Sequence, residues 1–151
     1  MTQAIQMQSA DTSDEDAAIA RIAREIRVIA VVGLSPNPDR PSWGVARYLQ
    51  SQGFRIIPVN PGHAGGEILG ERVYADLTTI PKDAGGEMVD IFRRSDAVSG
   101  IVDQAMEHLP DLKVIWTQLG VRDDQAAARA RAAGLVVVQN RCPKIEFPRY
   151  L

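Results

Sequence analysis

The residues best suited to chemistry lie in one short stretch, residues 28–42, which reads VIAVVGLSPNPDRPS. An apolar, β-branched run ends at Gly33, a loop carrying Arg40 follows, and Ser42 opens an amphipathic pattern. A buried strand that leads directly into a helix is how open α/β sheets build an anion site. Unpaired N–H groups at the helix start and the guanidinium of Arg40 both suit phosphate oxygens. The stretch therefore predicts a phosphate-binding turn.

The glycine pattern of this turn differs from that of dinucleotide-binding proteins. Their fingerprint is Gly-x-Gly-x-x-Gly, whereas Ser35 and Pro38 occupy the second and third glycine positions here. Those proteins also place an acidic residue at the end of the second strand to hold the ribose, and this chain has Asn60 and Pro61 there. A nicotinamide-dependent oxidoreductase is therefore the alternative rather than the leading hypothesis.

Composition excludes several classes of function. The chain has 151 residues, is 45% hydrophobic and 24% charged, and has a formal net charge of -2. This charge disfavours a general nucleic-acid binder, which would be basic. No apolar run approaches the ~20 residues that span a bilayer, and no secretory signal is visible. The single cysteine, Cys142, cannot form an internal disulfide, which is typical of a cytoplasmic protein.

Strand-like and helix-like patterns alternate along the chain. We expect strands at residues 28–32, 55–59, 88–92, 114–117 and 135–139, and helices at residues 14–26, 42–52, 96–108 and 123–133. This alternation predicts an α/β fold, Rossmann-like and doubly wound, with a mainly parallel five-stranded sheet and helices on both faces. We expect residues 1–12 to form a disordered tail and residues 13–151 to form a single domain.

The loops that follow the strands should meet at one edge of such a sheet, where ligands bind. The five converging segments are residues 33–42, 60–66, 93–95, 118–122 and 140–146. The connecting region over residues 60–86 is expected to hold a short strand at 72–74 and a helical turn near 77–80. The sequence does not suggest a pair of catalytic carboxylates. It suggests no Ser-His-Asp arrangement and no cluster of metal ligands either.

Six motifs in order resemble those of a known family. They are VVGLSPNPDRPS at 31–42, IIPVNP at 56–61, GEILGERVY at 66–74, VDIFRRS at 89–95, WTQLGVR at 116–122 and NRCPKIE at 140–146. On these motifs the chain resembles the small Rossmann-fold CoA-binding proteins. These are similar to the CoA-binding domains of the succinyl-CoA synthetase alpha subunit and the NDP-forming acyl-CoA synthetases.

The resemblance implies roles for particular residues. It implies that the CoA phosphates are held by Gly33, Ser35, Arg40 and Ser42. It implies that Asn60 and Pro61 lie near the adenosine, that Phe92 and Arg93 border the nucleotide or the start of the pantetheine arm, and that Gln118 and Gly120 line the path of that arm.

The leading hypothesis is a protein that binds coenzyme A or an acyl-CoA without evident catalysis by this chain alone. The sequence has no counterpart of the second domain in which the synthetases keep their phosphorylated histidine. An interaction module for a separate ligase-like subunit is a further alternative, and assembly with a second copy of the chain stays open. Because Cys142 follows the last strand, it is expected at the ligand edge, where a CoA thiol would arrive and could exchange disulfides with it.

Overall fold

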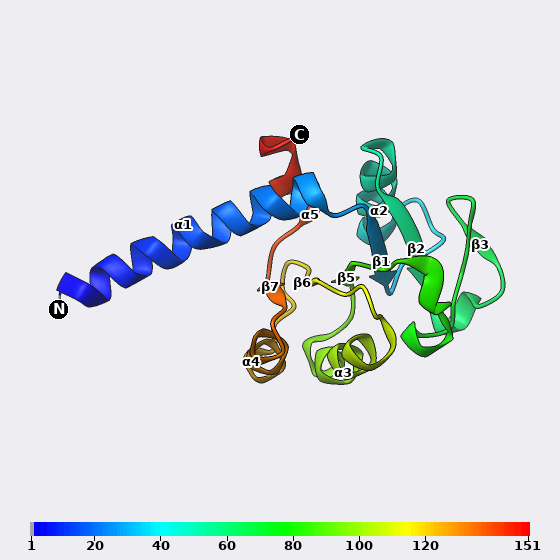
Figure 1. Cartoon of the computed structure of the whole chain (residues 1–151). Coiled ribbons are helices and arrows are strands. Elements are labelled where there is room, and N and C mark those ends of the chain that lie inside the picture. Colours follow the sequence, from blue (N-terminus) through cyan, green and yellow to red (C-terminus); the bar gives the residue numbers. More distant parts are fainter. Residues whose placement is uncertain (1) are drawn as a thin grey trace.

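The chain folds around a parallel five-stranded sheet (Figure 1). The computed structural model describes the backbone of residues 2–151 and the side chains from residue 14 onward. The strands are β1 (Val28–Val32), β2 (Arg55–Val59), β5 (Met88–Ile91), β6 (Val114–Thr117) and β7 (Val136–Val138). Each predicted strand is confirmed to within one residue at either end. Their order in the sheet is β2-β1-β5-β6-β7, and every neighbouring pair is parallel.

Helices cover both faces of the sheet, as the predicted fold class requires. On one face, α1 (Thr2–Glu25), α2 (Pro41–Ser51) and α5 (Pro143–Glu146) enclose one hydrophobic cluster. On the other face, α3 (Val98–His108) and α4 (Asp124–Ala132) enclose a second cluster. Figure 1 shows the two groups of helices on opposite sides of the strands. None of the helices that the structure describes is both long and apolar enough to cross a membrane.

Helix α1 is longer than the sequence predicted. It begins at Thr2 instead of near residue 14. Its last turns pack on the sheet through buried Ile19, Ile22 and Ala23. Because the side chains of residues 1–13 lie outside the described part, the division into a disordered tail and one domain stays a prediction.

Two serines near helix starts use their hydroxyl groups to join loops. Helix α2 begins at Pro41 with Arg40 as the N-cap residue, so Ser42 lies within the first turn. There its hydroxyl oxygen accepts a hydrogen bond from the Ser35 N–H at 3.0 Å. Ser95 lies in the single 3-10 turn η4 (Ser95–Ala97) that precedes α3. Its hydroxyl accepts from the Arg122 N–H at 2.9 Å, which joins two loops at the same edge of the sheet.

The connecting region contains a small hairpin and a 3-10 turn. The hairpin pairs β3 (Glu67–Ile68) with β4 (Glu71–Arg72), so the strand predicted at residues 72–74 lies one residue earlier and has a partner that the prediction missed. Tyr74 forms an isolated bridge to Val59 of β2. The predicted turn near residues 77–80 is confirmed as η2 (Leu77–Thr79), which Asp76 caps.

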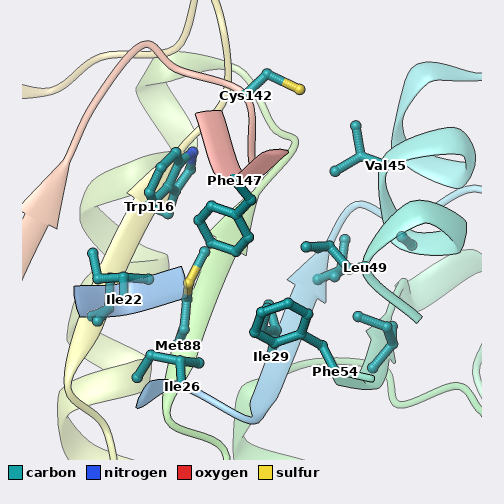
Figure 2. Close-up of a cluster of buried hydrophobic side chains, with 14 of the residues drawn as sticks. Ile22, Ile26, Ile29, Val45, Leu49, Phe54, Met88, Trp116, Cys142 and Phe147 are labelled. Atoms are coloured by element: carbon teal, nitrogen blue, oxygen red, sulfur yellow. The ribbon is translucent and has the colours of Figure 1, made fainter. Parts of the chain in front are cut away.

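The C-terminal segment closes the face of the sheet that α1 and α2 share. Phe147 is fully buried there, in the 3-10 turn η5 (Phe147–Arg149) that follows α5. Its ring centroid lies 5.6 Å from that of Trp116, edge to face, and 5.5 Å from that of Phe54. Figure 2 shows Phe147 between these elements, with Met88 and Leu49 nearby. Trp116 is therefore a core residue and not a surface for stacking a ligand.

Candidate functional site

The site lies where the order of the strands reverses. Chain progression runs from β1 outward to β2 on one side and from β5 to β7 on the other, so the reversal falls between β1 and β5. In open α/β sheets this position leaves a crevice beyond the carboxyl ends of the strands, where ligands bind. Gly33 follows β1 and Phe92 follows β5, so both residues lie at the crevice.

Gly33 and Phe92 approach each other so closely that a side chain at position 33 is excluded. Gly33 has a φ of 89°, and a Cβ built on it would lie 2.3 Å from the Phe92 carbonyl oxygen. The same Cβ would lie 3.2 Å from Cδ of Arg93, so the arginine side chain passes directly over Gly33. The Gly33 N–H is already used, because it donates to the Val59 carbonyl oxygen at 2.8 Å.

A cavity of about 670 Å³ opens on one side of this contact. Its volume lies within the range of small-molecule sites, roughly 300–1,000 Å³. Four predicted site residues meet in its walls: Phe92, Arg93, Gln118 and Cys142. The other lining residues come from the start of α2 and from the loops after β5 and β6, and they are Pro41, Val45, Arg94, Leu119 and Val121. The larger cavity thus has mainly apolar walls with a few polar groups.

A smaller hollow of about 240 Å³ opens beyond the ends of β1 and β2. Pro61 and Arg93 line it, together with Asp76 at the start of η2 and residues of α3 such as Ile101 and Gln104. Arg93 is therefore common to both hollows. Its neighbour Arg94 is paired with Asp96 at 2.8 Å, whereas no carboxylate of the described residues lies within ion-pair distance of Arg93. The unpaired guanidinium at the junction is suited to an anion.

Gln118 carries a polar atom without a partner in the wall of the larger cavity. The residue is 7% exposed, and its Oε1 is buried without a hydrogen-bond partner among the described residues. Its backbone N–H donates to the Ile91 carbonyl oxygen at 3.2 Å, which fixes the loop after β6 against β5. A buried oxygen without a donor is unfavourable, so this position fits a ligand that brings an N–H or O–H group.

The loops beside the larger cavity are held by side-chain hydrogen bonds. The Thr117 hydroxyl donates to the Val121 carbonyl oxygen at 2.7 Å and accepts from the Asn140 N–H at 3.0 Å. The Gly120 N–H donates to Oδ1 of Asn140 at 2.7 Å. Gly120, with a φ of 80°, therefore shapes the loop and lines neither of the two hollows. These bonds fix Gln118 and the segment before Cys142 relative to each other.

The proline-containing loop is likewise tied to the end of β2. Nδ2 of Asn60 donates to the Leu34 carbonyl oxygen at 3.0 Å, and its Oδ1 accepts from the Gly62 N–H at 3.0 Å. Asn60 therefore joins two loops at the position where dinucleotide-binding proteins place their ribose-binding acid. Arg40, by contrast, is exposed and lines neither hollow. The predicted residues Gly33, Ser35 and Ser42 also line neither hollow, and Ser42 lies in the first turn of α2.

Sequence reasoning missed several cavity residues. Pro41, Val45 and Val121 are apolar, and nothing in their types distinguishes them from core residues. Leu119 carried a usable signal in the sequence, because it stands between two predicted site residues, Gln118 and Gly120. Asp76 lies in the connecting region, whose path across the end of β2 the sequence did not reveal.

Comparison with known proteins agrees with this geometry. A family model described as a CoA binding domain matches residues 27–148. The chain belongs to this CoA-binding family. The uncharacterized protein YneT of Bacillus subtilis (strain 168) is 36% identical over 129 residues, which cover 85% of this chain and 91% of YneT. A solved protein from Thermus thermophilus, cell-free ID.343, is 30% identical with a TM-score of 0.82, covering 90% of this chain and 98% of that one.

The same fold occurs inside a larger enzyme. The dinucleotide-forming acetyl-coenzyme A synthetase 1 of Ca. Korarchaeum cryptofilum aligns with a TM-score of 0.61 and 22% identity. The alignment covers 79% of this chain but only 27% of that enzyme. The likeness extends to the fold and to about a quarter of the larger chain. It agrees with the resemblance to NDP-forming acyl-CoA synthetases that the motifs indicated.

Proposed function

We propose that this domain binds coenzyme A or an acyl-CoA in an extended form across the crevice between β1 and β5. The observation that carries the proposal is the position of Arg93, which has no carboxylate partner among the described residues and borders both hollows. CoA likewise has a nucleotide at one end, a flexible arm at the other and a diphosphate between them. The order of chemical groups along the ligand thus matches the order of features along the crevice.

The nucleotide is assigned to the smaller hollow. Its walls combine apolar side chains with the carboxylate of Asp76 and the amide of Gln104. An adenine ring is flat and apolar on its faces, and its amino group donates hydrogen bonds, so these groups suit it. Pro61 borders the same hollow, in agreement with its expected place near the adenosine.

The diphosphate is assigned to the junction above Gly33. The absence of a side chain on Gly33 leaves room there for the Arg93 side chain. The guanidinium of Arg93 can pair with phosphate oxygens, and the start of α2 adds the positive end of a helix dipole. Ser35 and Ser42 hold the loop beneath this point through their mutual hydrogen bond.

The pantetheine arm is assigned to the larger cavity. The arm is mostly apolar but contains amide N–H groups, and the cavity is mostly apolar but is lined by Gln118, whose Oε1 is unpartnered among the described residues. Phe92 and Cys142 line the same cavity as Gln118, and we assign the thiol end of the arm to the side of Cys142. Because Arg93 borders both hollows, these residues support a path for the arm from the diphosphate into the larger cavity.

Calorimetric titration of the full chain under reducing conditions tests the proposal. CoA and acetyl-CoA should bind with saturable heats, and NAD(H) should give none. Pantetheine, which lacks the nucleotide, should bind far more weakly than CoA because it cannot reach Arg93. Flat titrations with CoA, acetyl-CoA and dephospho-CoA on folded protein would refute the proposed function.

A further inference from the structure

The only cysteine of the chain lies in the wall of the larger cavity. Cys142 is 7% exposed and belongs to the hydrophobic cluster around Trp116 and Phe147, yet it also borders open space. Figure 2 shows its side chain at the margin of that cluster. A cysteine enclosed by the core is chemically inert, whereas a thiol in a cavity wall can react with a ligand that fills the cavity.

A second observation in the same cavity points to a ligand. Oε1 of Gln118 is buried and lacks a donor among the described residues. Buried polar atoms are nearly always hydrogen-bonded in native proteins, so an isolated acceptor on a side chain that lines a cavity points to a donor from outside the described residues. An amide N–H of a pantetheine arm is such a donor, and it would bring the sulfur end of that arm into the cavity that Cys142 lines.

We propose that Cys142 is a redox-active thiol that forms a mixed disulfide with CoA delivered to it as a CoA-type disulfide. This inference rests on the proposed function, because the crevice must hold the nucleotide and the arm. The fraction of the protein that carries this disulfide would then depend on the ratio of CoA disulfide to reduced CoA.

The reaction is thiol–disulfide exchange. The Cys142 sulfur, after losing its proton to water, attacks one sulfur of the CoA disulfide. The S–S bond of the CoA disulfide breaks as the new bond to Cys142 forms. One CoA leaves as a thiolate and takes up a proton, so it is reduced while Cys142 is oxidised. A free thiol such as CoA or glutathione reverses the modification by the same attack.

The test compares two disulfides that share the reactive arm. CoA disulfide contains the nucleotide, whereas pantethine is the disulfide of pantetheine alone. Intact-mass spectrometry follows adduct formation on the full chain with each reagent at the same low concentration. CoA disulfide should react about tenfold or more faster, the factor that one charge-assisted contact contributes. The nucleotide portion of CoA, added alone, should slow the reaction with CoA disulfide but not with pantethine.

Matched variants locate the source of this selectivity. Arg93→Ala should lower the rate with CoA disulfide about tenfold or more and leave the rate with pantethine unchanged. Arg55→Ala removes the same charge from the opposite edge of the sheet, at the first residue of β2, and should change neither rate. Gln118→Leu should slow both reagents, because both carry the pantetheine amides.

Three outcomes would overturn the inference. They are the absence of any CoA adduct, equal rates for CoA disulfide and pantethine, and a uniform effect of Arg93→Ala on both reagents. The calorimetric titration with reduced CoA separates the two proposals. Saturable CoA binding without a mixed disulfide refutes only the role of Cys142, whereas flat titrations refute the binding function itself.

Discussion

The backbone of Gly33 lies against the carbonyl group of Phe92, so closely that a Cβ on Gly33 would come within 2.3 Å of that oxygen. The two residues directly follow β1 and β5, the strands that flank the reversal of strand order. The contact therefore sets the width of the crevice at the point where the two hollows meet. It explains why position 33 needs glycine for space as well as for its positive φ.

We predict that Gly33→Ala destabilises the protein and impairs CoA binding. The clash and the positive φ together should lower the free energy of unfolding by about 2–3 kcal/mol, measured by urea denaturation. Gly53→Ala is the matched control, because Gly53 has a φ of 95° and no atom within 4 Å of its Cβ position. It should cost only the ~1–2 kcal/mol of left-handed strain. Equal losses in the two variants would contradict a steric role for Phe92.

Arg93→Ala should weaken CoA binding by about 1.5–3 kcal/mol, the range for hydrogen bonds to charged groups. The reason is the position of the guanidinium at the junction of the two hollows, without a competing carboxylate among the described residues. Calorimetry measures the change, and Arg55→Ala serves as the charge control. If the variant binds CoA with the affinity of the wild type, the Arg93 side chain points into solvent and does not contact CoA.

Arg40→Ala tests the phosphate loop separately. Arg40 is exposed at the N-cap of α2 and has no side-chain capping bond. If it reaches the phosphates, its loss should also weaken CoA binding by about 1.5–3 kcal/mol. The free energy of unfolding should change by less than about 0.5 kcal/mol, as for most surface substitutions. Unchanged affinity in the titration would leave Arg93 as the cation that binds phosphate.

Asp90→Asn should change how stability depends on pH. Asp90 lies in β5, fully buried, with both carboxyl oxygens unpartnered among the described residues. Burial raises its pKa well above the ordinary value of 3.8, so the folded state holds this proton more tightly than the unfolded state. Its contribution to stability is then complete below pH 3.8 and is lost as the pH rises toward the folded-state pKa.

The wild type should therefore lose stability relative to Asp90→Asn as the pH rises from 3.8. Urea denaturation of both proteins at a series of pH values measures the difference. Parallel curves would mean that Asp90 ionises in the folded protein as easily as in the unfolded chain.

Phe147→Ala should destabilise the protein by about 3–5 kcal/mol, the usual loss for a buried phenylalanine. Phe147 is fully buried against Trp116 and Phe54 and anchors the C-terminal segment to the sheet. Ile145→Ala lies in the same segment at a residue that is 59% exposed, and should change stability by less than about 0.5 kcal/mol. Thermal and urea unfolding compare the two variants. Similar losses of stability in the two variants would mean that the buried Phe147 ring does not anchor the C-terminal segment.

The sequence by itself determined the fold class, the order of the elements and the loops that meet at the ligand edge. Strand and helix periodicity depend on local spacing, so the strands beginning at Val28 and Arg55 could be placed directly. The rule that parallel strands present their carboxyl ends at one edge then placed Arg93, Gln118 and Cys142 in loops at that edge without any measured distance. The family motifs supplied the expectation of CoA.

Only the tertiary structure decided which of these residues share a cavity. The close contact of Gly33 with Phe92 and the position of Arg93 between two hollows depend on strand order, which no local pattern specifies. Ser42 likewise reads in sequence as the residue that opens a helix, but its hydroxyl oxygen accepts a hydrogen bond from the Ser35 N–H across the loop. Whether a polar group such as Oε1 of Gln118 finds a partner depends on residues far apart in the chain, because burial and hydrogen bonding are set by packing.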